Sequence, residues 1–407
     1  MTGAVTDSAN RADSPSGGQP LLLLLCATAA LLEGFDTQSM GVAAPRVIAE
    51  FGLSSGQSAV IFSAATLGLA VGAAIGGRIA DYLGRTRSLG GSLLLFGVFS
   101  LLTAATRNVE TLFAARLLTG LGLGAAMPNF ISLASESAPA RHRLVASTLV
   151  LAAMPMGGVS AGLVALGAAW GWNWRTIFLA GGLAPLLPAI VLWRWPAERR
   201  GTLDASPPVD TVATVLFGGE RALTTVLLWT GFFFTQLVLL LMLNWLPSLM
   251  IGIGFSRTQA SLASICFNLS GSLGAIVLGR LHAGRRRRLW VITTYTGMAL
   301  ALTAVGAVGK VFSVAALACA FAGLFIIGAQ LILFALAPLY YPFAMRGTGV
   351  GAAVAVGRLG SVIGPLIAGA LLARGGDSAT VLLAIVPFVV VGGTAALALA
   401  GRRQIVN

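Results

Sequence analysis

Long apolar segments follow one another along most of the chain, and short polar stretches separate them. A helix needs roughly 17–25 mostly apolar residues to span a bilayer. Twelve segments reach that length, at 21–44, 57–79, 88–106, 111–134, 144–168, 176–195, 223–250, 259–279, 289–308, 312–336, 347–372 and 379–400. The pattern predicts an all-α membrane protein with twelve transmembrane helices.

The polar stretch 196–222, between the sixth and seventh segments, is the main break in composition. It predicts a cytoplasmic linker between an N-terminal six-helix half, 21–195, and a C-terminal six-helix half, 223–400, with short tails at 1–20 and 401–407. The fifth and eleventh segments carry similar glycine-rich patterns, which suggests that the halves are pseudo-symmetric. Two related halves around a site in mid-membrane are typical of secondary transporters.

Basic residues indicate how the chain crosses the membrane, because cytoplasmic loops carry an excess of Lys and Arg. With the N-terminus inside, eighteen of the 26 basic residues fall in cytoplasmic segments, six fall outside and two lie within spans. The densest run, Arg285–Arg288, is then cytoplasmic, where it can contact anionic lipid headgroups. We expect a multi-pass protein of the bacterial inner (plasma) membrane with both termini in the cytoplasm.

Composition argues against other classes of protein. Hydrophobic residues make up 57% of the chain and charged residues 10%, whereas soluble domains carry about 25% charged residues. A soluble enzyme is therefore excluded. The net charge of +13 is spread over the ends of the apolar segments, which argues against nucleic-acid binding. The three cysteines lie inside apolar segments without metal-like spacing, so we expect neither a metal nor another cofactor.

Two carboxylates interrupt the first apolar segment, in the motif Glu33-Gly-Phe-Asp36. A charge at the centre of a lipid-facing helix costs roughly 2.5–3.5 kcal/mol, so both side chains should face a cavity or a partner. Residues three apart share one helix face. We expect Glu33 and Asp36 to exchange protons and to couple transport to them. The alternative is a buried ion-pair network that only orients the helices.

Two arginines lie in other spans, Arg116 near the start of the fourth and Arg358 within the eleventh. A guanidinium suits an anionic substrate because its fork can bind both oxygens of a carboxylate at once. We therefore predict that both arginines bind substrate, and the alternative is that each only neutralises an acid. At about 1.5 Å per helical residue, Glu33 and Arg358 both fall near the membrane midplane.

The loop after the second span contains Asp81 and, four residues later, Arg85. An acid at a helix end can pair with a base or with another helix end in one conformation only. We predict that Asp81 and Arg85 form a gate. The equivalent loop of the second half, 279–285, has no acidic residue.

Polar and aromatic side chains interrupt the seventh and tenth spans. Gln236, Asn244 and Trp245 lie in the seventh span, and Gln330 lies in the tenth. Polar side chains inside a membrane need partners. We predict Asn244, Trp245 and Gln330 as substrate ligands, although most such residues serve helix packing.

These motifs resemble the major facilitator superfamily. The loop 77–87, the glycine-rich span that follows Arg116 and the segment 360–365 carry the resemblance. The pair Glu33-Gly-Phe-Asp36 is similar to the Asp-Gly-Phe-Asp motif of its aromatic acid:H⁺ symporter family. The resemblance implies the major facilitator fold, and it implies that Glu33, Asp36 and Asp81 are important.

Within that family, the segments 115–129, 243–247 and 335–365 look closest to bacterial transporters of 3-(3-hydroxyphenyl)propionate. The chain departs from the wider family pattern in two ways. Glu33 stands where Asp is commoner, a change that the phenylpropionate group shares, and the second-half loop has no acidic residue to form an equivalent gate. The resemblance implies uptake of an aromatic carboxylate together with protons.

We therefore expect a secondary active transporter that imports a hydroxyphenylpropionate- or hydroxybenzoate-like acid by proton symport. Its partners would be this acid, protons and membrane lipid, and it would act as a monomer. The alternatives are an effluxer, or an importer of another small organic acid or drug. A membrane sensor with a transporter fold is a further alternative, but no polar segment here is long enough for a cytosolic signalling domain.

Overall fold

The computed structural model describes residues 19–138, 143–167, 171, 173–195, 212–219, 221–282, 286–307, 309, 311–342 and 345–402. These residues contain twelve helices that are long and apolar enough to cross a membrane, and they contain no strand. The predicted all-α fold with twelve spans is confirmed. Most residues of the predicted tails and linker, and Arg285 of the basic run, lie outside the described residues.

Each half contains six spans. The first half comprises α2 (Gln19–Phe51), α3 (Ser55–Leu83), α4 (Arg85–Ala105), α5 (Val109–Ser137), α6 (Arg143–Leu166) and a sixth span made of α7 (Arg175–Leu183) and α8 (Leu186–Trp193). The short α9 (Val212–Phe217) precedes the second half. That half comprises α10 (Arg221–Ile253), α11 (Arg257–His282), α12 (Arg287–Ala307), α13 (Phe312–Leu336) with the 3-10 turn η3 (Ala337–Tyr340), α14 (Arg346–Ala373) and a twelfth span made of α15 (Ser378–Ala384) and α16 (Val386–Ala400).

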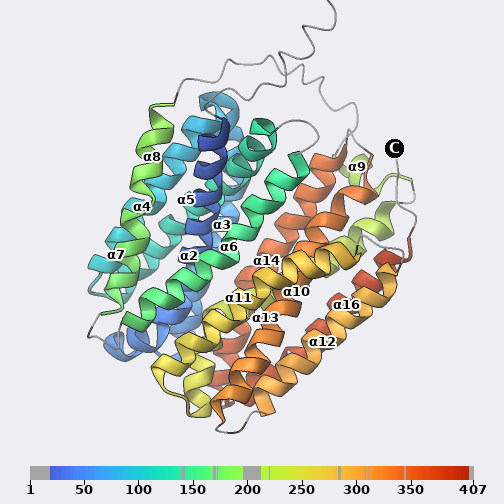
Figure 1. Ribbon diagram of the computed structural model, residues 1–407. Coiled ribbons are helices and arrows are strands. Elements are labelled where there is room, and N and C mark those ends of the chain that lie inside the picture. Colours follow the sequence, from blue (N-terminus) through green and yellow to red (C-terminus); the bar gives the residue numbers. More distant parts are fainter. Residues whose placement is uncertain are drawn as a thin grey trace, which may run out of the picture.

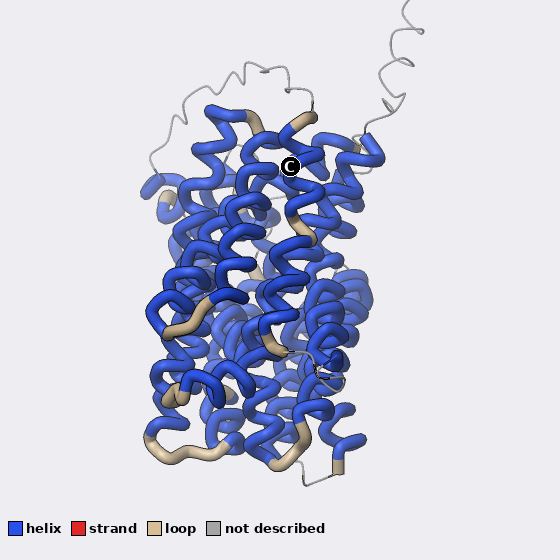
Figure 2. Tube along the Cα trace, turned by 90° about the vertical axis from the view of Figure 1, so that its left-hand side faces the viewer, coloured by secondary structure: helices blue, strands red, loops and turns tan. Residues whose placement is uncertain are grey.

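The two halves lie side by side, the first coloured blue to green and the second yellow to red (Figure 1). Turned by 90°, the bundle shows its spans running roughly along one common axis (Figure 2). Helix α9 and the last residues of α16 lie at the same end of the bundle (Figure 1). This end is called the α9 end below, and the opposite end is called the far end.

The second span of each half begins with the same local structure, which supports an internal repeat. Ser54 and Gln57 form a capping box at the start of α3, in which each side chain bonds the backbone N–H of the other. Ser256 and Gln259 make the same pair of hydrogen bonds at the start of α11. A glycine precedes each serine by two residues, and its φ is +61° in the first half and +112° in the second. Glycine adopts this conformation without a steric penalty, so the chain can turn sharply before each helix.

Glycine lets helices approach backbone to backbone within each half. A Cβ added to Gly34 of α2 would lie 1.8 Å from the carbonyl oxygen of Met154 in α6. At the equivalent contact in the second half, a Cβ added to Gly360 of α14 would lie 2.1 Å from the carbonyl oxygen of Phe233 in α10. Membrane helices associate through such close packing because lipid is as apolar as the helix surfaces. From the glycine patterns of the fifth and eleventh spans, Gly157 and Gly360 lie at such contacts within their halves, whereas Gly158 and Gly162 contact α11 of the other half.

The halves meet where α2 contacts α10, α3 contacts α14 and α6 contacts α11. Two very close contacts between the halves lie towards the far end. A Cβ added to Gly41 would lie 2.1 Å from the carbonyl oxygen of Leu243, and one added to Gly369 would lie 2.3 Å from the Cβ of Ala59. No side chain fits at these two glycines in this conformation, so the far end is tightly closed there.

Candidate functional site

A cavity lies between the two halves. Its volume is about 130 Å³, and an apolar cavity of about 150 Å³ is enough to bind benzene. Four helices of the first half (α2, α3, α5 and α6) and four of the second (α10, α11, α13 and α14) line it. Most of the wall is apolar. Its polar and charged residues are Glu33, Asp36, Thr37, Thr66, Arg116, Gln236, Asn244, Asn268, Gln330 and Arg358.

Asp36 and Arg116 form a bidentate ion pair at the cavity wall. Arg116 donates from Nη1 to Oδ1 at 2.8 Å and from Nη2 to Oδ2 at 2.9 Å. Both side chains are only 1% exposed, and the guanidinium lies over the ring of Phe178, 5.3 Å from its centroid. Each charge is neutralised by the other. The predicted role of Arg116 as a substrate ligand stays a prediction, because both of its terminal nitrogens are occupied in this conformation.

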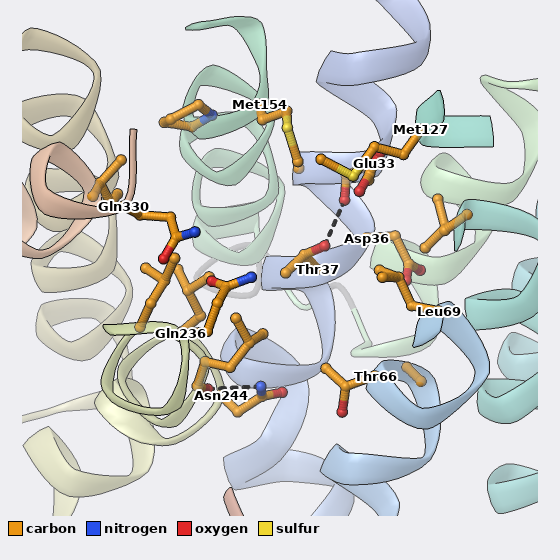
Figure 3. A pocket seen from close by; sticks show the side chains of 18 of the residues that line it. Glu33, Asp36, Thr37, Thr66, Leu69, Met127, Met154, Gln236, Asn244 and Gln330 are labelled. Carbon is orange, nitrogen blue, oxygen red and sulfur yellow. Dashed lines mark hydrogen bonds between the residues drawn. The ribbon is translucent and has the colours of Figure 1, made fainter. Parts of the chain in front are cut away.

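Glu33 lies nearly one helical turn before Asp36, and the ion pairs found among the described residues do not include it. Its side chain is 1% exposed, and neither Oε1 nor Oε2 has a hydrogen-bond partner among the described residues. Thr37 donates to the backbone carbonyl oxygen of Glu33 at 2.8 Å rather than to the carboxylate (Figure 3). A buried carboxylate is costly unless a proton or a cation neutralises it. Glu33 is therefore the acid of this site whose carboxylate has no hydrogen-bond partner among the described residues.

Arg358 of α14 is the second arginine of the cavity wall. It is 7% exposed, and its Nη2 donates to Sδ of Met127 at 2.8 Å, while its Nε has no partner among the described residues. A thioether sulfur is a weak acceptor, so most of the donor capacity of this guanidinium is unused. Arg358 and Glu33 interact electrostatically, but the ion pairs found among the described residues do not include one between them.

The second half contributes neutral amides to the cavity. Gln236 and Gln330 are each 5% exposed, and Oε1 of Gln236 and both polar atoms of Gln330 lack partners among the described residues. Both lie across the cavity from Glu33 (Figure 3). Asn244 also lines the cavity, and its Nδ2 donates to the carbonyl oxygen of Leu240 on its own helix at 2.8 Å. The structure thus brings Asn244 and Gln330 to the same cavity as Glu33, Asp36, Arg116 and Arg358.

Trp245 packs between the two halves beside the cavity. It is not among the residues that line the cavity, and it is 2% exposed. Its Nε1 donates to the carbonyl oxygen of Pro365 at 3.1 Å, and its ring meets Phe62 edge-on at a centroid distance of 4.9 Å. Because Phe62 belongs to the first half, Trp245 helps to join the halves. Its predicted contact with substrate stays untested.

The predicted gate residues are placed only in part. The backbone of Asp81 belongs to α3, and its side chain lies outside the described residues. Arg85, at the start of α4, forms an ion pair with Glu136 near the end of α5. Sequence reasoning missed Glu136, since nothing in the spacing of the two residues connects them.

Sequence reasoning also missed a hydrogen-bonded link between the halves. Gln38 of α2 donates from Nε2 to the carbonyl oxygen of Leu243 in α10 at 3.0 Å. Its Oε1 accepts from Nδ2 of Asn268 in α11, also at 3.0 Å. Both side chains are buried, 1% and 3% exposed. A signal was present in the sequence, because each is a polar residue inside an apolar span and such residues need partners.

Comparisons with known proteins agree with this architecture. The 3-(3-hydroxy-phenyl)propionate transporter of Escherichia coli (strain K12) is 42% identical over 397 residues, covering 96% of this chain and 97% of that protein. The gallate transporter of Pseudomonas putida is 34% identical, covering 88% of this chain and 86% of the relative. A 4-hydroxybenzoate transporter of Pseudomonas putida is 32% identical, covering 89% and 88%.

Solved structures share the fold at low sequence identity. A bacterial homolog of the human lysosomal transporter Spinster, in an inward-facing and unoccupied conformation, has a TM-score of 0.77 at 16% identity, covering 95% of this chain and 98% of that one. A D-xylose-proton symporter has a TM-score of 0.73 at 20% identity, covering 93% and 96%. Residues 26–365 match the family model described as the Major Facilitator Superfamily. The chain is thus a multi-pass membrane transporter rather than an enzyme, and it belongs to the Major Facilitator Superfamily.

Proposed function

We propose that this protein imports a small aromatic carboxylate across the bacterial inner membrane together with protons. The observation that carries the proposal is the cavity, in which both carboxylate oxygens of Glu33 and Nε of Arg358 are buried without hydrogen-bond partners among the described residues, and Nη2 of Arg358 donates only to the weak acceptor Met127. The names of the relatives support the substrate class, since they describe transporters of hydroxylated aromatic acids.

The arriving carboxylate would bind Arg358. A guanidinium binds the two oxygens of a carboxylate through parallel hydrogen bonds. Met127 is a weak acceptor that the substrate can replace, so little hydrogen bonding is lost. The aromatic ring would then lie against the apolar wall, which includes Leu239, Leu331 and Phe334.

Glu33 would carry the proton. In the empty cavity, the charge of Arg358 helps to balance a deprotonated Glu33. When the substrate carboxylate takes up that positive charge, Glu33 loses its counter-charge and gains a proton. Substrate and proton would therefore bind together, which is the requirement for symport. The Asp36–Arg116 pair, being internally neutral, would keep the neighbouring wall in place, with Asp36 free to exchange a proton in another conformation.

Transport also requires that the cavity opens to each side in turn. We propose that the α9 end faces the cytoplasm and that both termini are cytoplasmic, as the distribution of basic residues predicts. The far end is then outside, and the conformation described here is closed to the outside at Gly41 and Gly369. The hydrogen bonds of Gln38 across the halves would break when the outside opens.

The test is binding of the acid by purified Arg358→Lys. The lysine keeps the positive charge but loses the fork, so affinity for the acid should fall about ten-fold or more, since hydrogen bonds to charged groups are worth roughly 1.5–3 kcal/mol. The matching aromatic amide has no negative charge, and it should bind wild type and variant equally poorly. Arg374→Lys is the control, because Arg374 is an exposed residue at the end of the same helix. Wild-type affinity in Arg358→Lys would show that Arg358 is only a structural counter-ion.

A further inference from the structure

The cavity has a second polar region that the carboxylate and the proton do not use. Gln236 of α10 and Gln330 of α13 are 95% buried, and three of their four polar side-chain atoms have no hydrogen-bond partner among the described residues. Leaving a buried polar atom unpaired is unfavourable, and a purely structural glutamine would normally be paired within the protein. Two such residues facing one cavity indicate that a ligand or water completes their hydrogen bonding.

The chemistry of a side-chain amide restricts what that ligand group can be. A glutamine offers a carbonyl oxygen that accepts and an NH₂ group that donates, and it carries no charge. A second carboxylate would find no base on this side of the cavity among the residues that line it, since both lining arginines, Arg116 and Arg358, face the acids of the first half. A hydroxyl group can donate to an Oε1 atom and accept from an Nε2 atom, so it matches the free atoms of both residues.

The arrangement of the cavity also fits such a group. Glu33 lies on one side and the two glutamines lie on the other (Figure 3). Most of the remaining wall is apolar, with Leu240, Met154 and Ile327 among its residues. Arg358 interacts with Glu33, so a ligand whose carboxylate binds Arg358 and whose ring carries a hydroxyl group would have a partner for each group.

We propose that Gln236 and Gln330 form a hydroxyl-binding subsite that selects ring-hydroxylated aromatic acids over the same acids without the hydroxyl group. This inference rests on the proposed function, because it takes the substrate to be an aromatic carboxylate. A site built to hydrogen-bond a hydroxyl group rejects the analogue that lacks it, since the polar groups of the site are then left unpaired.

The experiment compares two ligands that differ only in the hydroxyl group, 3-(3-hydroxyphenyl)propionate and 3-phenylpropionate. Their affinities are measured with purified protein in lipid nanodiscs. Wild type should bind the hydroxylated acid at least about ten-fold more tightly. Gln330→Leu and Gln236→Leu should weaken binding of the hydroxylated acid and leave 3-phenylpropionate unchanged or more tightly bound. The reason is that leucine removes the unpaired amide as well as the hydrogen bond.

Thr303→Val is the control. Thr303 of α12 is not among the residues that line the cavity, and its hydroxyl group donates to the carbonyl oxygen of Ala299 at 2.9 Å. This variant should keep the preference of the wild type. Gln330→Met, which is unbranched like glutamine, replaces Gln330→Leu if the leucine variant does not fold.

The outcomes separate the subsite from the proposed function. A wild type that binds neither acid would contradict the proposed function itself. A wild type that binds both acids equally would overturn the subsite and leave carboxylate transport standing. Glutamine variants that fold but lose affinity for both acids by the same factor would also overturn the subsite, because the residues would then act only through packing.

Discussion

The Asp36–Arg116 pair makes a quantitative prediction about stability. Two charge-assisted hydrogen bonds of 2.8 and 2.9 Å join the two side chains, and both residues are 1% exposed. Arg116→Met leaves the carboxylate buried without its cation, and Asp36→Leu leaves the guanidinium buried without its anion. Removing one partner of a buried ion pair costs about 3–5 kcal/mol. Each single variant should therefore be strongly destabilised.

The double variant Arg116→Met with Asp36→Leu should be more stable than either single variant. It leaves no buried charge, and replacing a buried pair by apolar residues is often neutral or stabilising. The two single losses add to about 6–10 kcal/mol, so a double variant near wild type would imply a coupling energy of that order. A coupling energy of this size would mean that the contribution of each side chain to stability depends strongly on the presence of the other.

Thermal unfolding of the four proteins in detergent provides the assay. Membrane proteins commonly unfold irreversibly, so apparent Tm values are compared at one heating rate. Both single variants should have clearly lower Tm values, and the double variant should recover most of the loss. Losses that simply add in the double variant would refute the reasoning. The two side chains would then contribute separately, for example through the contact of Arg116 with Phe178.

Three further predictions concern the proton, the packing and the opening of the cavity. Glu33→Gln resembles the protonated residue. In vesicles, this variant should still exchange substrate across the membrane but should no longer accumulate it when a pH gradient is imposed. Retained accumulation would exclude Glu33 as the proton carrier. Gly34→Ala places a Cβ 1.8 Å from a carbonyl oxygen of α6, whereas a Cβ at Gly77 meets nothing within 4 Å. Gly34→Ala should therefore greatly reduce the yield of folded protein and Gly77→Ala should not, and equal yields would contradict the packing. Gly41→Ala should force α2 and α10 apart at the far end. A cysteine introduced at Thr66, in a variant without native cysteines, should then react faster with an impermeant thiol reagent added outside, and an unchanged rate would argue against this closure.

The twelve spans could be predicted because the length of an apolar segment is enough to identify a membrane helix. The ends of the helices could not be predicted so well. The first and seventh spans were placed at 21–44 and 223–250, but α2 and α10 each have 33 residues and run to Phe51 and Ile253. Hydropathy marks where a helix leaves lipid, and hydrogen bonding can continue the helix into more polar sequence.

The breaks within the sixth and twelfth spans were also missed. In each case an apolar segment contains two helices, and a proline lies at the start of the second one: Pro185 is the residue before α8, and Pro387 is the second residue of α16. Proline lacks a backbone N–H and is accepted at the first turn of a helix, so a new helix can begin there. An apolar segment with an internal proline remains continuous in a hydropathy profile.

The site could be predicted as a set of residue types but not as a set of pairs. Charged residues inside spans identified Glu33, Asp36, Arg116 and Arg358, and all four line one cavity. Depth along a helix does not fix which way each side chain points, so the sequence did not reveal that Asp36 pairs with Arg116. Contacts between the halves, such as those of Gln38, depend on tertiary packing and were not visible in the pattern.

The most direct test of the central claim uses the purified protein in proteoliposomes. An acidic outside and a neutral inside are imposed, and uptake of labelled 3-(3-hydroxyphenyl)propionate is followed with and without an uncoupler. We expect the acid to accumulate above its equilibrium level, the uncoupler to abolish this accumulation, and Arg358→Lys to reduce it while Arg374→Lys does not. Accumulation that ignores both the gradient and the uncoupler, or that is the same in all variants, would contradict proton-coupled transport of an aromatic carboxylate through this cavity.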